Sequence, residues 1–337
     1  MRQLAIITLL IFVSILDAAE QPVTVRVGFF PNLTHSPAIA ARQLEREGAD
    51  WHLAHLPPGS KIEWRSYNAG PSAMEALLAG AIDLTYVGPS PVINAHVRTK
   101  GQQIRILAPV AHAGNALVVR KGLNLKTPKD FKGRRLATPQ LGNTQDIDTR
   151  VWLKQGGLKV ALNGGDAQII PAANAELVSL FSRGDVDAAW TIEPWVTRLT
   201  TEFGGEILVE NKESIITILA SSKTALSKNK RGIEAFVQSH YLLRDKLLAD
   251  QSWHERLVRD GIGGETRSTI PKAELISTAL SRVVFDARED DATRKARLTV
   301  ALTQALKDSQ ASGLLNGDAP IEPLLESLIA DPAPVQK

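Results

Sequence analysis

Two segments of the chain carry the residue types best suited to hold a small polar molecule. In the first, an apolar stretch runs into a turn of small polar residues that opens a helix at Asn143–Thr144, with Gln145 next. Such a turn directs several backbone N–H groups at one point, which favours an anion. Asn143 or Thr144 also suits the helix N-cap, and both roles can hold at once. Asp146 suits the positive end of the helix and is expected to point away from an anion.

The second segment reads Trp-Thr-Ile-Glu-Pro-Trp over residues 190–195. A carboxylate is unfavourable at a purely anionic site, so Glu193 in a cleft indicates a ligand that carries an amine or another donor. Trp190 or Trp195 could then pack on its apolar part or stack under a ring or cation. The alternative is that Glu193 caps a helix or forms a surface ion pair, with Trp195 in the core.

Neither segment carries an obvious nucleophile or the spacing of metal ligands. We therefore expect a protein that binds a small polar molecule and releases it unchanged. The sequence predicts no catalytic residue, no cofactor and no metal.

Further ligand-binding candidates lie in other loops. Thr34 and His35 precede a helix and could cap it or contact the ligand, and the lone His35 suits a neutral donor better than a metal site. The remaining candidates are also ordinary turn or cap residues by type: Asn32, Gly88, Ser90, Gly114 and Asn115.

The N-terminus and the composition indicate an exported globular protein. A basic start, a short apolar run and the small residues Ala18 and Ala19 form the layout of a cleavable signal peptide, residues 1–19. The chain has no cysteine, so we expect no disulfide and no lipoprotein anchor. The net charge of +3 is small and its basic residues are scattered, which argues against nucleic-acid binding. The length predicts two domains.

Strand-like and helix-like segments alternate along the chain, which predicts an α/β fold with mostly parallel sheets. Ligands of such sheets sit beyond the carboxyl ends of the strands. Ser36 and Ser90 each precede a proline and are expected to cap a helix, and residues 229–310 are expected to be mainly helical. Five loops are expected to face one cleft: 30–36, 88–90, 112–115, 139–145 and 191–195.

One pattern occurs twice. A helical segment ends at Gly80 and Asp83 begins a strand; another ends at Gly184 and Asp187 begins a strand. This echo favours two lobes built on one plan, although helix–glycine–strand units are common in α/β proteins.

Several motifs, in order and spacing, resemble those of periplasmic substrate-binding proteins of ABC importers. The similarity is to the nitrate/sulfonate/taurine branch, also called SsuA/THI5-like or NMT1-like. It covers nearly the whole mature chain. The motifs that carry it are 25–30 with Thr34-His35-Ser36-Pro37, 74–83, Gly88-Pro89-Ser90-Pro91, 114–119, 131–139, Gly142-Asn143-Thr144 and 184–195.

The resemblance implies a two-lobed type II periplasmic-binding-protein fold with the ligand cleft between the lobes. Lobe one would comprise residues 20–115 plus 220–330, and lobe two residues 116–219. Leu117–Val119 and Ile216–Leu219 would cross between them, and the lobes would close on the ligand by a hinge motion. The Pro-rich tail, 331–337, is expected to be disordered.

The resemblance also implies a periplasmic monomer that delivers a small organic anion or zwitterion, such as an aliphatic sulfonate or taurine, to a membrane permease. Nitrate and a thiamine-precursor pyrimidine remain alternatives. An enzyme on the same fold is less favoured, because pyrimidine-making relatives carry a cysteine-rich motif that this chain lacks. His35 with Glu193 could in principle act as an acid/base pair. A sensor role would need a separate signalling protein.

Overall fold

The computed structural model describes residues 21–332 apart from 163, 267–270 and 287. The predicted signal peptide, 1–19, lies outside the described residues. No helix in the described part of the chain is long and apolar enough to cross a membrane.

The first lobe is built on a six-stranded sheet in the order β11-β4-β10-β3-β1-β2. Its strands are β1 (Thr24–Phe29), β2 (Lys61–Ser66), β3 (Leu84–Val87), β4 (Ile104–Ala113), β10 (Ile215–Ser222) and β11 (Val283–Phe285). Its helices are α1 (Ser36–Arg46), α2 (Gly70–Leu78), α3 (Pro89–Arg98), α7 (Lys223–Ala249), α8 (Gln251–Thr266), α9 (Ala273–Leu280) and α10 (Asp291–Ser312). The helical content of 229–310 is confirmed.

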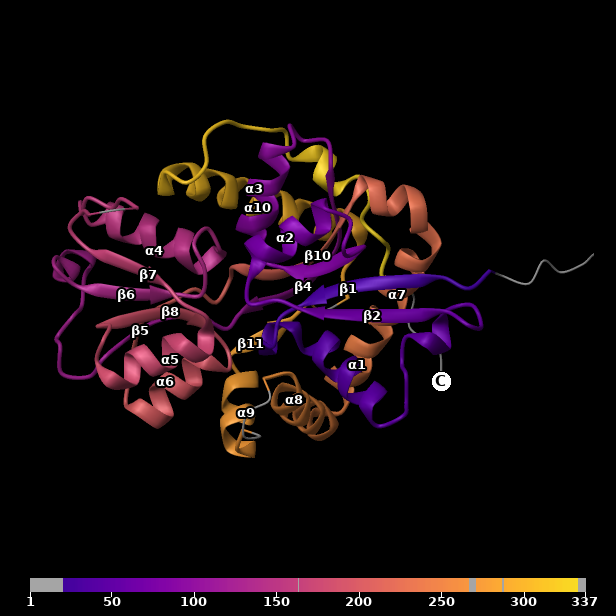
Figure 1. The fold of residues 1–337 in the computed structure, drawn as a ribbon, viewed down its shortest axis with the longest axis horizontal. Coiled ribbons are helices and arrows are strands. Elements are labelled where there is room, and N and C mark those ends of the chain that lie inside the picture. Colours follow the sequence, from indigo (N-terminus) through magenta and orange to yellow (C-terminus); the bar gives the residue numbers. More distant parts are fainter. Residues whose placement is uncertain (1–20, 163, 267–270, 287, 333–337) are drawn as a thin grey trace, which may run out of the picture.

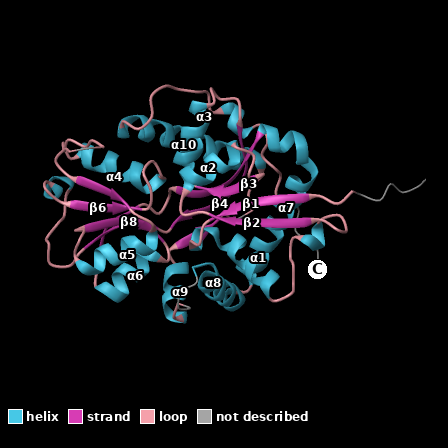
Figure 2. Cartoon of the chain, viewed as in Figure 1, coloured by secondary structure: helices cyan, strands magenta, loops and turns pink. Residues whose placement is uncertain are grey.

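The second lobe is built on a five-stranded sheet in the order β7-β6-β8-β5-β9. Its strands are β5 (Asn115–Val119), β6 (Arg135–Thr138), β7 (Gln168–Pro171), β8 (Ala188–Ile192) and β9 (Glu206–Glu210). Its helices are α4 (Thr144–Gln155), α5 (Asn174–Arg183) and α6 (Trp195–Phe203). Figures 1 and 2 show the two sheets next to each other, each with helices on both faces, and each face buries its own apolar cluster.

The expectation of mostly parallel sheets is wrong. Among the described strands, four pairs are parallel and five are antiparallel. Each antiparallel pair includes β4, β5 or β10, and these strands, with β9, flank the connections between the lobes. These strands enter or leave a sheet directly, without a helical crossover, and therefore need not run parallel to their neighbours.

The connections between the lobes also differ from the prediction. Leu117–Val119 lies inside β5 and Ile216–Leu219 inside β10. The chain instead passes from β4 to β5 at Gly114, whose φ of +72° suits glycine, and from β9 to β10 through residues 211–214.

The repeated sequence pattern corresponds to a repeated contact. Asp83 accepts a hydrogen bond from the backbone N–H of Arg26 in β1 at 2.8 Å. Asp187 accepts one from the backbone N–H of Arg135 in β6, also at 2.8 Å. In each lobe the aspartate that follows the helix thus ties the start of one strand to the neighbouring strand.

Three local predictions need correction or restriction. Ser36 is the first residue of α1 rather than its cap, and its hydroxyl donates to the Leu33 carbonyl. The cap residue of α3 is Gly88, not Ser90. Asp331, at the start of the predicted disordered tail, forms an ion pair with Arg244 at 2.8 Å, and residues 333–337 lie outside the described part.

Candidate functional site

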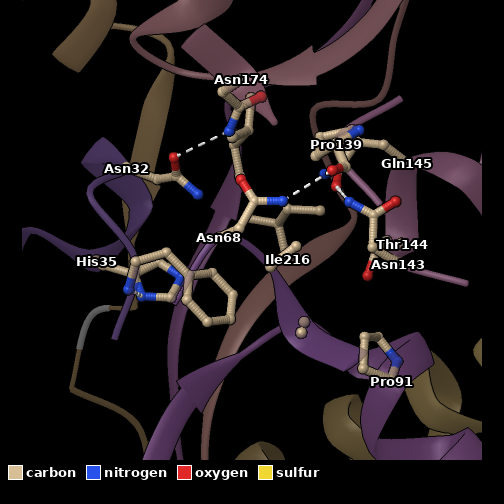
Figure 3. A pocket seen from close by; sticks show the side chains of 15 residues that line it. Asn32, His35, Asn68, Pro91, Pro139, Asn143, Thr144, Gln145, Asn174 and Ile216 are labelled. Atoms are coloured by element: carbon tan, nitrogen blue, oxygen red, sulfur yellow. Dashed lines mark hydrogen bonds between the residues drawn. The ribbon is translucent and has the colours of Figure 1, made fainter. Parts of the chain in front are cut away.

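A small cavity of about 30 Å³ lies between the two lobes, and residues of both line it (Figure 3). Six of the predicted ligand-binding residues line it: Asn32, His35, Gly88, Asn143, Thr144 and Gln145. Two polar residues that the sequence prediction missed, Asn68 and Asn174, line it as well. None of the described lining residues carries a carboxylate, an ammonium or a guanidinium group.

Five of the described helices begin at this cavity. Gly70, Thr144 and Asn174 are the first residues of α2, α4 and α5, while His35 and Gly88 are the caps of α1 and α3. Each helix N-terminus carries unpaired N–H groups and the positive end of the helix dipole. The arrangement gives the cavity a positive potential without a charged side chain.

His35 is held as a neutral hydrogen-bond donor. Its Nδ1 accepts a hydrogen bond from the Phe30 backbone N–H at 3.1 Å, so Nε2 carries the ring proton. Burial lowers the pKa of His35 to about 3. The predicted neutral character of this side chain is therefore consistent with the geometry.

The turn before α4 is braced by its own side chains. Asn143 caps the helix by accepting from the Asp146 N–H at 2.9 Å, and its amide donates to the Gln145 side-chain oxygen at 2.9 Å. Asp146 does point away from the cavity. It is buried, forms an ion pair with Arg150 at 2.9 Å and does not line the cavity. Asn143 and Gln145 line the cavity instead.

Thr144 brings the two lobes into contact. Its buried hydroxyl has no hydrogen-bond partner among the described residues. A β-carbon placed on Gly88, in the other lobe, would overlap this hydroxyl. Glycine at position 88 therefore permits this approach without a shift of the Thr144 side chain. The unpartnered hydroxyl keeps its hydrogen-bonding capacity for a ligand.

Six predicted site residues do not line the cavity. Thr34 is fully buried and its hydroxyl has no described partner. Gly114 connects the lobes, and its carbonyl accepts from the Glu193 N–H at 2.8 Å. Asn115 donates to Asp148 at 3.0 Å. Ser90 lines a neighbouring groove, which shares Thr144 with the cavity and also contains Asp148.

Glu193 and Trp195 were predicted as possible ligand contacts, and their side chains point elsewhere. Glu193 accepts hydrogen bonds from the Thr197 backbone and hydroxyl at 3.0 Å each, which caps α6, and pairs with Arg282 at 2.9 Å. Trp195 is buried, and its indole N–H donates to the Asn32 side-chain oxygen at 3.1 Å. The cap and core alternative is therefore the better description of both, and the His35–Glu193 acid/base pair is not assembled in the cavity.

Like the predicted residues that line the cavity, Asn68 and Asn174 lie where a strand is followed by a helix. Asn68 comes just after β2 and before α2, and Asn174 follows β7 and opens α5. Asn68 also donates to the Pro139 carbonyl of the other lobe at 2.9 Å (Figure 3). A search of every strand-to-helix loop in the sequence would have found both.

No group of three or more metal-binding side chains occurs among the described residues. The polar groups at the cavity are amides, a hydroxyl, a neutral imidazole and backbone N–H groups.

Residues 18–251 match the sequence profile of the NMT1-like family. The chain belongs to this family. It is 26% identical over 187 residues to the taurine-binding periplasmic protein of Escherichia coli, covering 54% of this chain and 56% of that protein. It is 28% identical over 197 residues to a putative aliphatic sulfonates-binding protein of the same organism, covering 58% and 57%. The matched region thus spans little more than half the length of these relatives.

Solved structures agree on the fold. The alkanesulfonate-binding protein SsuA from Xanthomonas axonopodis pv. citri superposes with a TM-score of 0.68 at 20% identity, over 91% of this chain and 99% of that one. The periplasmic nitrate-binding protein NrtA from Synechocystis PCC 6803 gives 0.62 at 14% identity, over 91% and 92%. The two-lobed periplasmic-binding-protein fold that the family resemblance implied is confirmed.

Proposed function

We propose that this protein is the periplasmic solute-binding component of an ABC importer and that it captures a small organic anion, an aliphatic sulfonate, for delivery to the membrane permease. The convergence of five helix N-termini on a cavity without charged side chains carries the proposal. Oriented N–H dipoles stabilise an anion without a fixed counter-charge. The names of the taurine- and sulfonate-binding relatives support the same ligand class.

The donor set favours a sulfonate monoanion. A sulfonate presents three acceptor oxygens, which the Thr144 hydroxyl, the His35 Nε2–H and side-chain amides can meet with donors. The ammonium of taurine would need an acceptor or a carboxylate, and Glu193 does not line the cavity. We therefore place simple alkanesulfonates ahead of taurine.

The mechanism we propose is capture by closure, without chemical change. Lobe-to-lobe contacts at the cavity, such as Asn68 with Pro139 and Thr144 with Gly88, exist only when the lobes are together. A ligand that contacts both lobes favours this closed state, which a permease can distinguish from the open one. We expect the protein to act in this way as a monomer.

A ligand panel tests the proposal. Thermal midpoints are measured with ethanesulfonate, taurine, nitrate, sulfate and hydroxymethylpyrimidine, and affinities by calorimetry. A ligand at 100 times its Kd adds about 2.7 kcal/mol to the free energy of unfolding. We expect the largest shift with ethanesulfonate.

Two variants connect the binding to the cavity. Thr144→Val removes the unpartnered hydroxyl and should weaken ethanesulfonate binding by about tenfold. Thr201→Val makes the same change in helix α6, where the hydroxyl donates to the Thr197 carbonyl of the same helix and does not line the cavity, so binding should stay unchanged. A shift with the pyrimidine or nitrate and none with ethanesulfonate would contradict the sulfonate assignment.

A further inference from the structure

Trp195 and Asn32 meet across the cleft. Asn32 precedes α1 in the first lobe and Trp195 is the first residue of α6 in the second. Their side chains are buried, and the indole Nε1 lies 3.1 Å from the Asn32 Oδ1. An indole nitrogen can only donate, so the atom of Asn32 that faces it must be the amide oxygen.

A second donor occupies the same oxygen. The amide of Asn174 reaches Asn32 Oδ1 at 3.5 Å, and the Thr191 hydroxyl holds Asn174 in place from the other side at 2.7 Å. With its oxygen directed at these donors, Asn32 turns its NH2 group toward the centre of the cavity (Figure 3). No described residue accepts a hydrogen bond from that NH2 group.

On the basis of the proposed function, we propose that Trp195 is a positioning residue that fixes Asn32 as a hydrogen-bond donor to the ligand. The site thereby selects anionic oxygens over groups that donate hydrogen bonds. If the amide of Asn32 rotated by half a turn, its NH2 would face the indole N–H. The indole N–H of Trp195 and the amide N–H of Asn174 would then be buried without their acceptor, which is unfavourable. The bond crosses the cleft, so Asn32 is fixed in this way only when the lobes are closed.

The test compares two ligands of similar shape, the methanesulfonate anion and neutral methanesulfonamide, in which an NH2 group replaces one oxygen. Trp195→Phe keeps a ring and removes the indole N–H, so the Asn32 oxygen keeps only the long hydrogen bond from Asn174 at 3.5 Å and the amide rotates more readily. We expect methanesulfonate to bind about tenfold more weakly, as for one lost hydrogen bond, and the preference for it over the sulfonamide to narrow.

Trp190→Phe is the matched control. The Trp190 indole N–H is also buried in the second lobe, but it has no partner among the described residues. This variant loses a similar amount of packing and should keep the ligand preference of the wild type. Thermal midpoints and circular dichroism establish that both variants fold.

Two further variants separate positioning from packing. If Trp195 acts through Asn32, Trp195→Phe should weaken binding no further in an Asn32→Ala background. Asn32→Asp keeps an oxygen for Trp195 and Asn174 but presents an acceptor to the cavity, so it should reverse the preference toward the sulfonamide.

Wild-type preference in Trp195→Phe, or additive losses in the double variant, would overturn the inference while leaving the proposed function standing. Failure of the wild type to bind any sulfonate would overturn the proposed function and the inference with it.

Discussion

The carboxylate of Glu193 lies 2.9 Å from the guanidinium of Arg282, and the pair joins the two lobes. Arg282 precedes β11 of the first lobe and also pairs with Glu210 of the second at 2.5 Å. The backbone of Glu193 adds two contacts, because its carbonyl accepts from the Leu33 N–H at 2.9 Å and its N–H donates to Gly114. Glu193 therefore links three parts of the chain: the loop before α1, the connection between the lobes at Gly114 and the start of α6.

Arg282→Gln should destabilise the protein by about 2 kcal/mol. Removal of one partner from a buried ion pair costs roughly 3–5 kcal/mol where the remaining group stays charged. The loss is smaller here because Arg282 is 25% exposed and because Glu193, whose pKa burial raises to about 7, can take up a proton. Urea unfolding measures it. The control is Arg256→Gln, which breaks an ion pair with Glu47 between partly exposed side chains and should cost less than about 1 kcal/mol. Equal losses in both variants would contradict this role of Arg282.

Glu193 should also make stability depend on pH. Burial raises its pKa to about 7 from an ordinary value of 4.5, against the opposing effects of hydrogen bonds from Thr197 and the charge of Arg282. The folded state therefore binds this proton more tightly than the unfolded state. The resulting stabilisation is complete below pH 4.5 and is lost as the pH rises through 7.

Glu193→Gln removes this titration. Between pH 5 and 8, the free energy of unfolding of the variant should fall less with rising pH than that of the wild type. The measurement is a series of urea unfolding curves at fixed ionic strength. Parallel pH profiles for the two proteins would show that Glu193 titrates normally.

The resemblance to a known family predicted the two-lobed fold, and the local sequence predicted about half of the cavity. Backbone N–H groups at helix starts after strands are determined by local sequence, so Asn143, Thr144 and Gly88 could be predicted. The direction of a side chain within such a loop depends on partners that are distant in the sequence. Glu193 is directed to Arg282, 89 positions later in the chain, and nothing near residue 193 indicates that partner.

The repeated aspartates also show that the local sequence does not reveal a distant hydrogen-bond partner. The spacing from Gly80 to Asp83 and from Gly184 to Asp187 correctly predicted two similar lobes. It could not predict that each aspartate accepts from the backbone of a strand more than 50 positions earlier. The strand directions of β4, β5, β9 and β10 were mispredicted for a related reason, because hydrophobic patterns carry no information on the direction of the neighbouring strand.

Buried histidines should make the protein sensitive to acid. Burial lowers the pKa of His35 and His52 to about 3, from an ordinary value of 6.5. The unfolded state then binds these protons more readily. The contribution of the two histidines to stability is therefore complete above pH 6.5 and is lost as the pH falls toward 3. Each histidine adds about 1.4 kcal/mol per pH unit to this slope.

His52→Asn should reduce the acid slope by one proton. His52 is packed on Phe236 and lies outside the candidate site, so ligand binding at neutral pH should persist. Unfolding free energies from pH 7 to 4.5 provide the measurement, and an unchanged slope in His52→Asn would contradict the argument.

Gly88→Ala should prevent full closure of the lobes. The added β-carbon would overlap the Thr144 hydroxyl across the cleft. Gly88 has an extended φ of −75°, so alanine introduces no backbone strain and the separate lobes should fold normally. We expect a nearly unchanged thermal midpoint without ligand and a loss of most of the ligand-induced shift. In a Thr144→Ala background the same substitution should cause little additional loss, because the overlapping oxygen is gone. A full ligand-induced shift in Gly88→Ala would mean that the contact between Gly88 and Thr144 is not required for the bound state.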